Sequence, residues 1–206
     1  YHNDIRIIPT TIDTEEYFAK PEKSKDARIC IGWSGSITTI QHFEFAIPFL
    51  KRLKEKYGDK IYIKVIGDGT YVNEDLGIQG LPWEKDTEIE DLHEIDIGIM
   101  PLPDDEWAKG KCGLKGLQYM ALSIPTLMSP VGVNSEIIDD GQNGFLAVET
   151  SEWVEKISSL IDNKALRDTM GKAGRQTVIE KYSVEAWKDK YLEYFNDLIE
   201  NAPTKE

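Results

Sequence analysis

The sequence predicts an α/β domain in which a parallel sheet lies between two layers of helices, a Rossmann-like three-layer α/β/α arrangement. Short apolar runs alternate with helical periods from residue 28 to residue 162, and this alternation is typical of βαβ units. The longest early run, residues 28–33, is apolar on both faces, as central parallel strands are. A length of 206 residues suits one domain. Residues 1–206 are therefore treated as a single unit.

Each element is predicted from its own pattern. Residues 1–27 read as a leading linker or strand interrupted by Pro9, and residues 183–206 form a C-terminal helical segment. A period near 3.6 predicts a helix, and a short apolar run closed by glycine or proline predicts a strand. The expected strands are residues 28–33, 61–67, 78–81, 95–100, 125–128 and 144–148. The expected helices are residues 39–57, 87–92, 114–122, 151–161, 165–182 and 184–200, with a short helical turn opening at Ser135.

The stretch KGKCGLKGLQYMALSIPTLMS, residues 109–129, predicts a loop, a helix and a short buried strand. Glycines permit a tight turn before the helix, and Pro125 stops it because the residue before a proline avoids the α region. Leu114, Leu117 and Ala121 recur at spacings of three and four. That spacing predicts the face of the helix that packs on the sheet.

A second stripe on the same helix carries Lys111, Lys115 and Gln118. The free amides at the helix N-terminus come from around Cys112, Gly113 and Leu114 in this interpretation, and free amides beside two cations suit an anion such as a diphosphate ester. The alternative is a solvated lysine face on an amphipathic helix, which is common. Spacing alone does not separate the two readings. The Cys112 side chain itself is expected to be small and buried rather than nucleophilic.

Bulk composition limits the classes of function. The 24 basic and 37 acidic residues give a net charge of -13 at pH 7, which argues against wrapping nucleic acid. The two cysteines, Cys30 and Cys112, lack the spacing of a disulfide framework or a metal site and favour a reduced, cytoplasmic compartment. The histidines His2, His42 and His93 are scattered and predict no metal. No stretch approaches the roughly 18 apolar residues of a membrane span, and the start at Tyr1 rather than Met predicts that the chain is part of a longer protein.

Three loops are expected to meet at the carboxyl ends of the parallel strands, where ligands of open α/β sheets bind. They are residues 34–39, 68–70 and 103–113, each rich in glycine or small hydroxyl residues that let backbone approach a phosphate. Trp83 is expected to pack rather than to stack on a base.

The ordered set of motifs resembles the C-terminal, donor-binding half of a GT-B glycosyltransferase of the large retaining family 4. The resemblance covers nearly the whole chain. Its segments are IIPTTID (7–13), IGWSGS (31–36), VIGDG (65–69), KCGLKGLQYMALSIPTLMS (111–129) and VGVNSEIIDDGQNGFLA (131–147). The resemblance implies that Gly35 and Ser36 contact the donor's phosphates, that Gln118 occupies a ribose-binding position, and that the base lies near Leu81 and Pro82.

Three positions depart from the pattern of that family. Many members carry an arginine at the position of Ser36 and glutamates at the positions of Gly110 and Gln118. Lys111 and Lys115 are expected to supply the phosphate charge instead.

The resemblance therefore implies that the chain is the sugar-nucleotide-binding domain of a retaining glycosyltransferase of the hexosyltransferase type. The enzyme is expected to act in the cytoplasm, in cell-envelope polysaccharide synthesis. Where its acceptor is lipid-linked, it is expected to act at a membrane surface. The acceptor would bind in a preceding N-terminal domain, so this chain alone is expected to bind the donor without transferring sugar. No metal or further cofactor is implied, and no catalytic residue, base, sugar or acceptor is assigned.

Two alternatives stay open. A degenerate homologue would bind a nucleotide or a partner without chemistry, and Ser36, Gly110 and Gln118 favour it. A nicotinamide-binding domain has only Gly67 and Gly69 in its favour, because position 72 is Val where the fingerprint needs glycine.

Overall fold

The computed structural model describes residues 5–19 and 28–200. Its centre is a six-stranded sheet in the order β5-β2-β1-β6-β7-β8, with every paired neighbour parallel. The strands are β1 (Ile29–Ser34), β2 (Ile61–Gly67), β5 (Leu81–Pro82), β6 (Ile97–Met100), β7 (Thr126–Met128) and β8 (Phe145–Leu146). This confirms the predicted α/β class.

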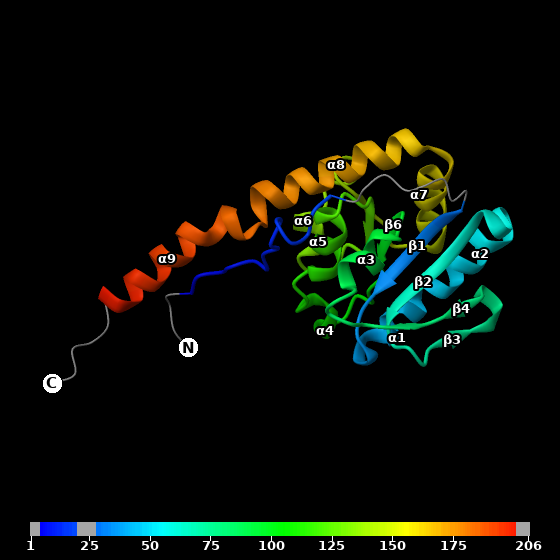
Figure 1. Cartoon of the computed structure of the whole chain (residues 1–206), viewed down its shortest axis with the longest axis horizontal. Helices are drawn as coiled ribbons and strands as arrows, with labels where there is room; N and C mark the ends of the chain where they lie inside the picture. Colours follow the sequence, from blue (N-terminus) through cyan, green and yellow to red (C-terminus); the bar gives the residue numbers. More distant parts are fainter. Residues whose placement is uncertain (1–4, 20–27, 201–206) are drawn as a thin grey trace.

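Helices cover both faces of the sheet (Figure 1). One face packs on α1 (Ile40–Phe43), α2 (Ile47–Tyr57) and α7 (Thr150–Asp162), where Phe49 and Trp153 stack with ring centroids 4.7 Å apart. The other face packs on α3 (Glu88–His93), α5 (Leu114–Ala121) and α8 (Lys164–Lys181). Short α4 (Glu106–Lys109) lies in the loop before α5, and short α6 (Asn134–Ile137) lies in the loop between β7 and β8. The sheet therefore lies between two layers of helices, as a three-layer α/β/α arrangement requires.

Two glycines bring α5 close to the sheet. A Cβ atom at Gly98 of β6 would lie 2.5 Å from the Tyr119 ring, and one at Gly116 would lie 1.7 Å from Met128 Cε. Tyr119 therefore reaches across to β1, where its hydroxyl accepts from Ser34 N at 2.6 Å and donates to Ser34 Oγ at 3.2 Å. Burial raises the pKa of Tyr119 to about 12, so the phenol keeps its proton. The contact fixes α5 against the end of β1.

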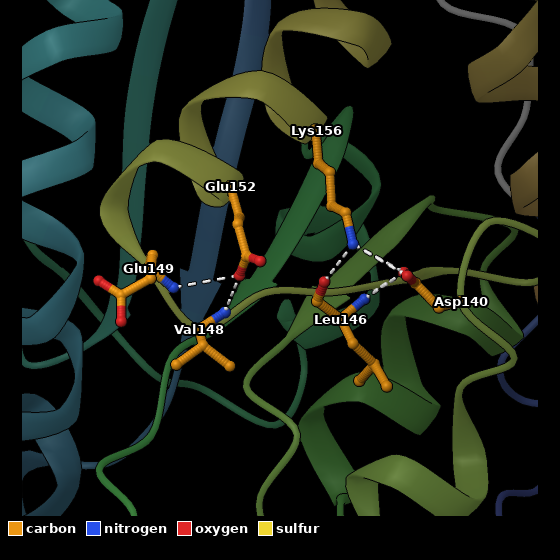
Figure 2. Close-up of polar contacts among 6 residues, drawn as sticks. All are labelled: Asp140, Leu146, Val148, Glu149, Glu152 and Lys156. Atoms are coloured by element: carbon orange, nitrogen blue, oxygen red, sulfur yellow. Dashed lines mark hydrogen bonds and ion pairs between the residues drawn. The ribbon is translucent and has the colours of Figure 1, made fainter.

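The last strand is tied to α7 by two carboxylates and a lysine (Figure 2). Lys156 Nζ bonds Asp140 Oδ2 at 2.9 Å and Leu146 O at 2.6 Å, while Leu146 N donates to the same Asp140. Glu152 accepts from the amides of Val148 and Glu149 at 2.8 and 3.1 Å, a capping contact at the start of α7. The edge of the sheet is thereby closed onto the helix that follows it.

Several predicted boundaries were wrong for identifiable reasons. The helix expected at 39–57 is interrupted by a 3-10 turn at Glu44–Ala46, because Pro48 lacks an amide hydrogen and is accepted only in the first turn of α2. The strand expected at 78–81 is two strands: β4 (Ile78–Gln79) pairs antiparallel with β3 (Val72–Asn73), and only β5 joins the main sheet. Residues 5–11 form no strand, and residues 20–27 of the leading segment lie outside the described residues.

The C-terminal helix α9 (Val184–Glu200) extends from the end of α8 away from the sheet (Figure 1). It has no buried residue. Its contacts with the leading segment include Arg6 to Asp197 at 2.7 Å and Arg6 over the Tyr194 ring. Among the described residues, no helix combines the length and apolar character needed to cross a membrane.

Candidate functional site

The loop after β1 is shaped by Trp33. A Cβ atom at Gly35 would lie 2.0 Å from the indole ring of Trp33, so only glycine lets the chain turn there. Gly67, at φ +135°, ends β2 beside it, and a Cβ at Gly67 would lie 2.5 Å from Gly35 O. The loops after β1 and β2 therefore touch, as the sequence predicts.

The amides of this loop are already engaged. Gly35 N donates to Ile66 O at 2.8 Å, and Ser36 N donates to Thr39 Oγ1 at 2.9 Å. Ser36 Oγ lies 3.0 Å from Thr38 Oγ1. The amides of Gly35 and Ser36 are thus not available to a ligand, and the loop offers the hydroxyl of an exposed Ser36 instead.

The N-terminus of α5 is different, because it is uncapped. Gly113 stands at its N-cap with φ +71°, a left-handed conformation that suits glycine, and has no side chain to cap the helix. Leu117 N donates to Gly113 O, whereas the amides of Leu114, Lys115 and Gly116 have no acceptor within the described part of the chain. Leu114 was expected on the packed face but is 41% exposed at this end. Its amide faces a solvated position, where an anion can be bound.

Lys115 and Lys111 are both held near this helix end. Lys115 Nζ lies 5.7 Å from the centroid of the Trp33 ring, and Lys111 Nζ lies 5.8 Å from that of Trp107. Burial, together with the positive charge of Lys111, lowers the pKa of Lys115. A charge that is partly desolvated and next to a like charge gains more than usual from a bound anion. Cys112, expected to be buried, is exposed between the two lysines.

His42 belongs to the same cluster, which the sequence did not reveal. It is 5% exposed, at the end of α1. Burial and then the charges of Lys111 and Lys115 lower its pKa, while Asp105 opposes them. A neutral imidazole beside two ammonium groups can become a third cation when an anion arrives. Because 69 positions separate His42 from Lys111, only the fold brings them together.

Gln118, predicted on the lysine stripe, lies next to a separate set of groups. It is 8% exposed, and its amide nitrogen donates to Tyr17 Oη at 2.7 Å and to Glu88 Oε1 at 3.1 Å. The structure thus groups Lys111, Lys115 and His42 at the start of α5 and places Gln118 one turn further along, toward β5 and α3. Trp83, expected to pack, is 47% exposed there.

Two hollows flank this edge of the sheet. One, of about 400 Å³, is lined largely by apolar side chains between α2 and the start of α7, including Phe45, Pro48 and Val148. The other, of about 330 Å³, lies between β5 and α3 and is lined by Leu81, Pro82 and four acidic residues. Within residues 5–19 and 28–200 no three His, Cys, Asp or Glu side chains gather as metal ligands.

Curated relatives share parts of this chain. A poly(ribitol-phosphate) alpha-N-acetylglucosaminyltransferase of Staphylococcus aureus is 36% identical over 87 residues, which are 41% of this chain and 18% of the relative. An alpha-1,3/1,6-mannosyltransferase of Homo sapiens is 35% identical over 91 residues, 42% of this chain and 21% of the relative. The matched segments are thus about a fifth of each relative's length.

Solved structures share the fold. TarM of S. aureus superposes on 87% of this chain and 37% of its own, with a TM-score of 0.70 at 20% identity. Anabaena HepE in complex with UDP-glucose superposes on 91% of this chain and 56% of its own, with a TM-score of 0.67 at 13% identity. At these identities the likeness establishes the Rossmann-like fold of GT-B glycosyltransferases.

The sequence profile of the family described as glycosyl transferases group 1 matches residues 13–177, most of the chain. The match includes the loops after β1 and β2, both lysines and the whole of α5. This chain belongs to the glycosyl transferases group 1 family.

Proposed function

We propose that this chain is the C-terminal, donor-binding domain of a retaining GT-B glycosyltransferase of family 4. It binds a nucleotide-diphosphate sugar, and the whole enzyme transfers the sugar to a glycan or lipid-linked acceptor. Family membership supports this proposal, as do the names of relatives that transfer N-acetylglucosamine or mannose and the UDP-containing titles of solved neighbours.

One observation carries the proposal at the level of chemistry. The uncapped start of α5 offers amides that have no acceptor among the described residues, and Lys111 and Lys115 lie beside them at the carboxyl edge of a parallel sheet. Amides of a helix N-terminus and two ammonium groups together suit a diphosphate. As the sugar leaves, negative charge grows on the bridging phosphate oxygen, and these groups lower the energy of that charge.

The remaining parts of the enzyme follow from this assignment. The acceptor-binding groups are assigned to a preceding domain, in keeping with the small share of each relative that the chain matches. Reaction would take place in the cytoplasm, at a membrane surface where the acceptor is lipid-linked. The two lysines provide positive charge to the leaving group, and no metal is part of the proposal.

A second candidate, a homologue that binds a nucleotide without transfer, is favoured by three positions. Ser36, Gly110 and Gln118 stand where the family pattern has arginine and two glutamates, and Gly110 is exposed with no side chain to reach a sugar. Both candidates predict binding of a nucleotide diphosphate. They differ in whether the parent protein shows transfer.

A thermal-shift screen of UDP-glucose, UDP-N-acetylglucosamine, GDP-mannose and NADH tests the binding function. A ligand that binds only the folded state raises the midpoint of unfolding. We expect a rise with at least one sugar nucleotide and none with NADH. A rise with NADH alone would replace the proposal with the nicotinamide-binding alternative.

A further inference from the structure

A closed ring of hydrogen bonds surrounds the carboxylate of Glu88, at the start of α3. Tyr17 donates its hydroxyl proton to Glu88 Oε2 at 2.6 Å, and Trp83 Nε1 donates to Oε1 at 2.8 Å. Gln118 donates from the same amide nitrogen to Glu88 Oε1 at 3.1 Å and to Tyr17 Oη at 2.7 Å. The four residues come from the leading segment, the loop after β5, α3 and α5.

The donors and acceptors in this ring can be assigned in only one way. An ionised carboxylate accepts and never donates, so every group that faces Glu88 must present a hydrogen. Burial and the hydrogen bond to Glu88 raise the pKa of Tyr17, so its phenol keeps the proton it donates. The amide of Gln118 therefore has its nitrogen inward, with one hydrogen for Glu88 and one for Tyr17. Turning the amide over would set its oxygen against a carboxylate.

The amide oxygen of Gln118 is left facing outward. No described residue donates a hydrogen bond to this oxygen. Among the described residues, only Asn134 Oδ1 is both buried away from solvent and without a hydrogen-bond partner. Gln118 Oε1 is thus an acceptor in contact with solvent, on a side chain that is otherwise 92% buried, since its exposed fraction is 8%. A fixed acceptor of this kind selects for a ligand hydroxyl.

Tyr17 is itself fixed in place from α8. Arg175 donates to Tyr17 O at 2.7 Å and also bonds Ala121 O, which ties the leading segment to the end of α5. Gln118 is one turn beyond Lys115 on α5, toward the exposed Trp83 ring. A nucleotide whose diphosphate lies at Lys115 would therefore have its sugar near Gln118.

We propose that Glu88 is a positioning residue that, with Tyr17 and Trp83, holds the oxygen of Gln118 outward as the acceptor for a ribose hydroxyl. The inference rests on the proposed function, since it assigns the nucleoside end of the same donor site. It also explains how a glutamine can serve where the family pattern has a glutamate. The side-chain nitrogen of Gln118 is already hydrogen-bonded within the protein, so the atom that it presents to the ligand is its carbonyl oxygen.

Calorimetric titration of UDP, 2′-deoxy-UDP and 3′-deoxy-UDP into the full 206-residue chain tests the assignment, and GDP with its two deoxy analogues is titrated in the same way. In the wild type, loss of the hydroxyl that meets Gln118 should weaken binding roughly tenfold, because a buried acceptor loses its partner. Glu88→Gln should reduce the ratio of UDP affinity to deoxy-UDP affinity to about threefold or less, since a glutamine at position 88 can hydrogen-bond to either orientation of the Gln118 amide. Asp86→Asn, at an exposed carboxylate two residues before Glu88 that does not line the hollow between β5 and α3, is the matched control and should keep the full ratio.

Each outcome decides something. Equal binding of UDP and both deoxy analogues by the wild type would overturn the role of Gln118 while leaving the proposed function standing. A ratio preserved in Glu88→Gln would overturn the positioning role of Glu88. Failure of the wild type to bind either UDP or GDP would overturn the proposed function, and the inference with it.

A second measurement needs neither a ligand nor a folded variant. In the free wild-type chain, NMR of the glutamine side-chain amides should show the two hydrogens of Gln118 widely separated and slow to exchange, because each is held by a different acceptor. Fast exchange like that of an exposed glutamine such as Gln41 would contradict the ring.

Discussion

Lys115 and His42 occupy positions that disfavour their charged forms in the free protein. Burial contributes most to lowering the pKa of each, and Lys111 adds to it. Natural proteins keep such residues where a ligand later compensates the charge, at the expense of stability in the free state. The two side chains therefore give predictions in which stability and binding change in opposite directions.

Lys115→Met should stabilise the free protein and weaken ligand binding at once. Removing a desolvated charge should raise the free energy of unfolding by about 1 kcal/mol. Loss of a charge-assisted contact should weaken UDP binding by about 1.5–3 kcal/mol, roughly 10- to 150-fold. Urea unfolding and calorimetry measure the two effects.

Lys172→Met is the matched control for that variant. Lys172 is exposed on α8, next to Gly171, whose backbone approaches Ser123 at the opposite end of α5. Neither stability nor UDP affinity should change appreciably. If Lys115→Met left affinity at the wild-type value, the diphosphate would not lie at Lys115. A fall in both quantities would indicate a folding defect instead.

His42 predicts a pH dependence of stability. Burial, Lys111 and Lys115 lower its pKa in the folded state against the opposing effect of Asp105, while the unfolded chain titrates near the ordinary value of about 6.5. Below that pH the unfolded state binds more protons, so stability is lost as pH falls and is fully present above it. Urea unfolding should show a smaller loss between pH 7.5 and 5.5 in His42→Gln than in the wild type. Equal losses would mean that His42 is solvated.

At this scale the sequence predicted some of the site and missed the rest for a clear reason. Lys111 and Lys115 are one helical turn apart, so spacing alone placed them together. Glu88 lies 71 positions from Tyr17, and Gln118 lies 101 positions from Tyr17. No local pattern reports contacts of that range, and only the fold showed which atom of Gln118 is free.

At the scale of elements, Gly35 fixes the geometry of the loop after β1. A methyl group there would overlap the Trp33 ring, over which Lys115 lies. Gly35→Ala should therefore lower the free energy of unfolding by about 1–3 kcal/mol and also weaken UDP binding. Denaturant unfolding and calorimetry check the pair of effects.

Gly110→Ala serves as its control in the loop before α5. A Cβ at Gly110 would lie 3.5 Å from Trp107 O, an ordinary contact, and the backbone is in the right-handed helical region. Stability should change by less than about 0.5 kcal/mol. If Gly35→Ala were tolerated equally well, Trp33 would not be the support for the site.

The elements themselves were mostly predictable, because long apolar runs bounded by glycine or proline became β1, β2, β6 and β7. The β3–β4 hairpin was missed, since strands of two residues show no alternation. Leu114 was misplaced because helix periodicity does not say which turn lies at the solvent end of a short helix. These misses are all local, and none changed the α/β class or the parallel sheet.

At the scale of the whole molecule, α9 contributes little to the domain core. It has no buried residue, and Leu192, Phe195 and Ile199 are each more than half exposed. Removing residues 188–206 should change the free energy of unfolding by less than about 1 kcal/mol, because exposed contacts such as Arg6–Asp197 are worth little. Met170→Ala in α8, where the side chain is 1% exposed, should lower it by about 2–5 kcal/mol. Comparable losses in the two variants would show that α9 is integral to the fold.

The location of the nucleotide is tested most directly by amide NMR shifts of the full chain on titration with UDP and, separately, with uridine. With UDP, the largest changes should fall on the amides of Leu114, Lys115 and Gly116, because these are the amides without acceptors at the start of α5. Uridine should leave those three amides nearly unchanged, since it lacks the diphosphate. Changes confined to the apolar hollow around Phe45 and Val148, or identical changes with both ligands, would contradict a diphosphate site at α5.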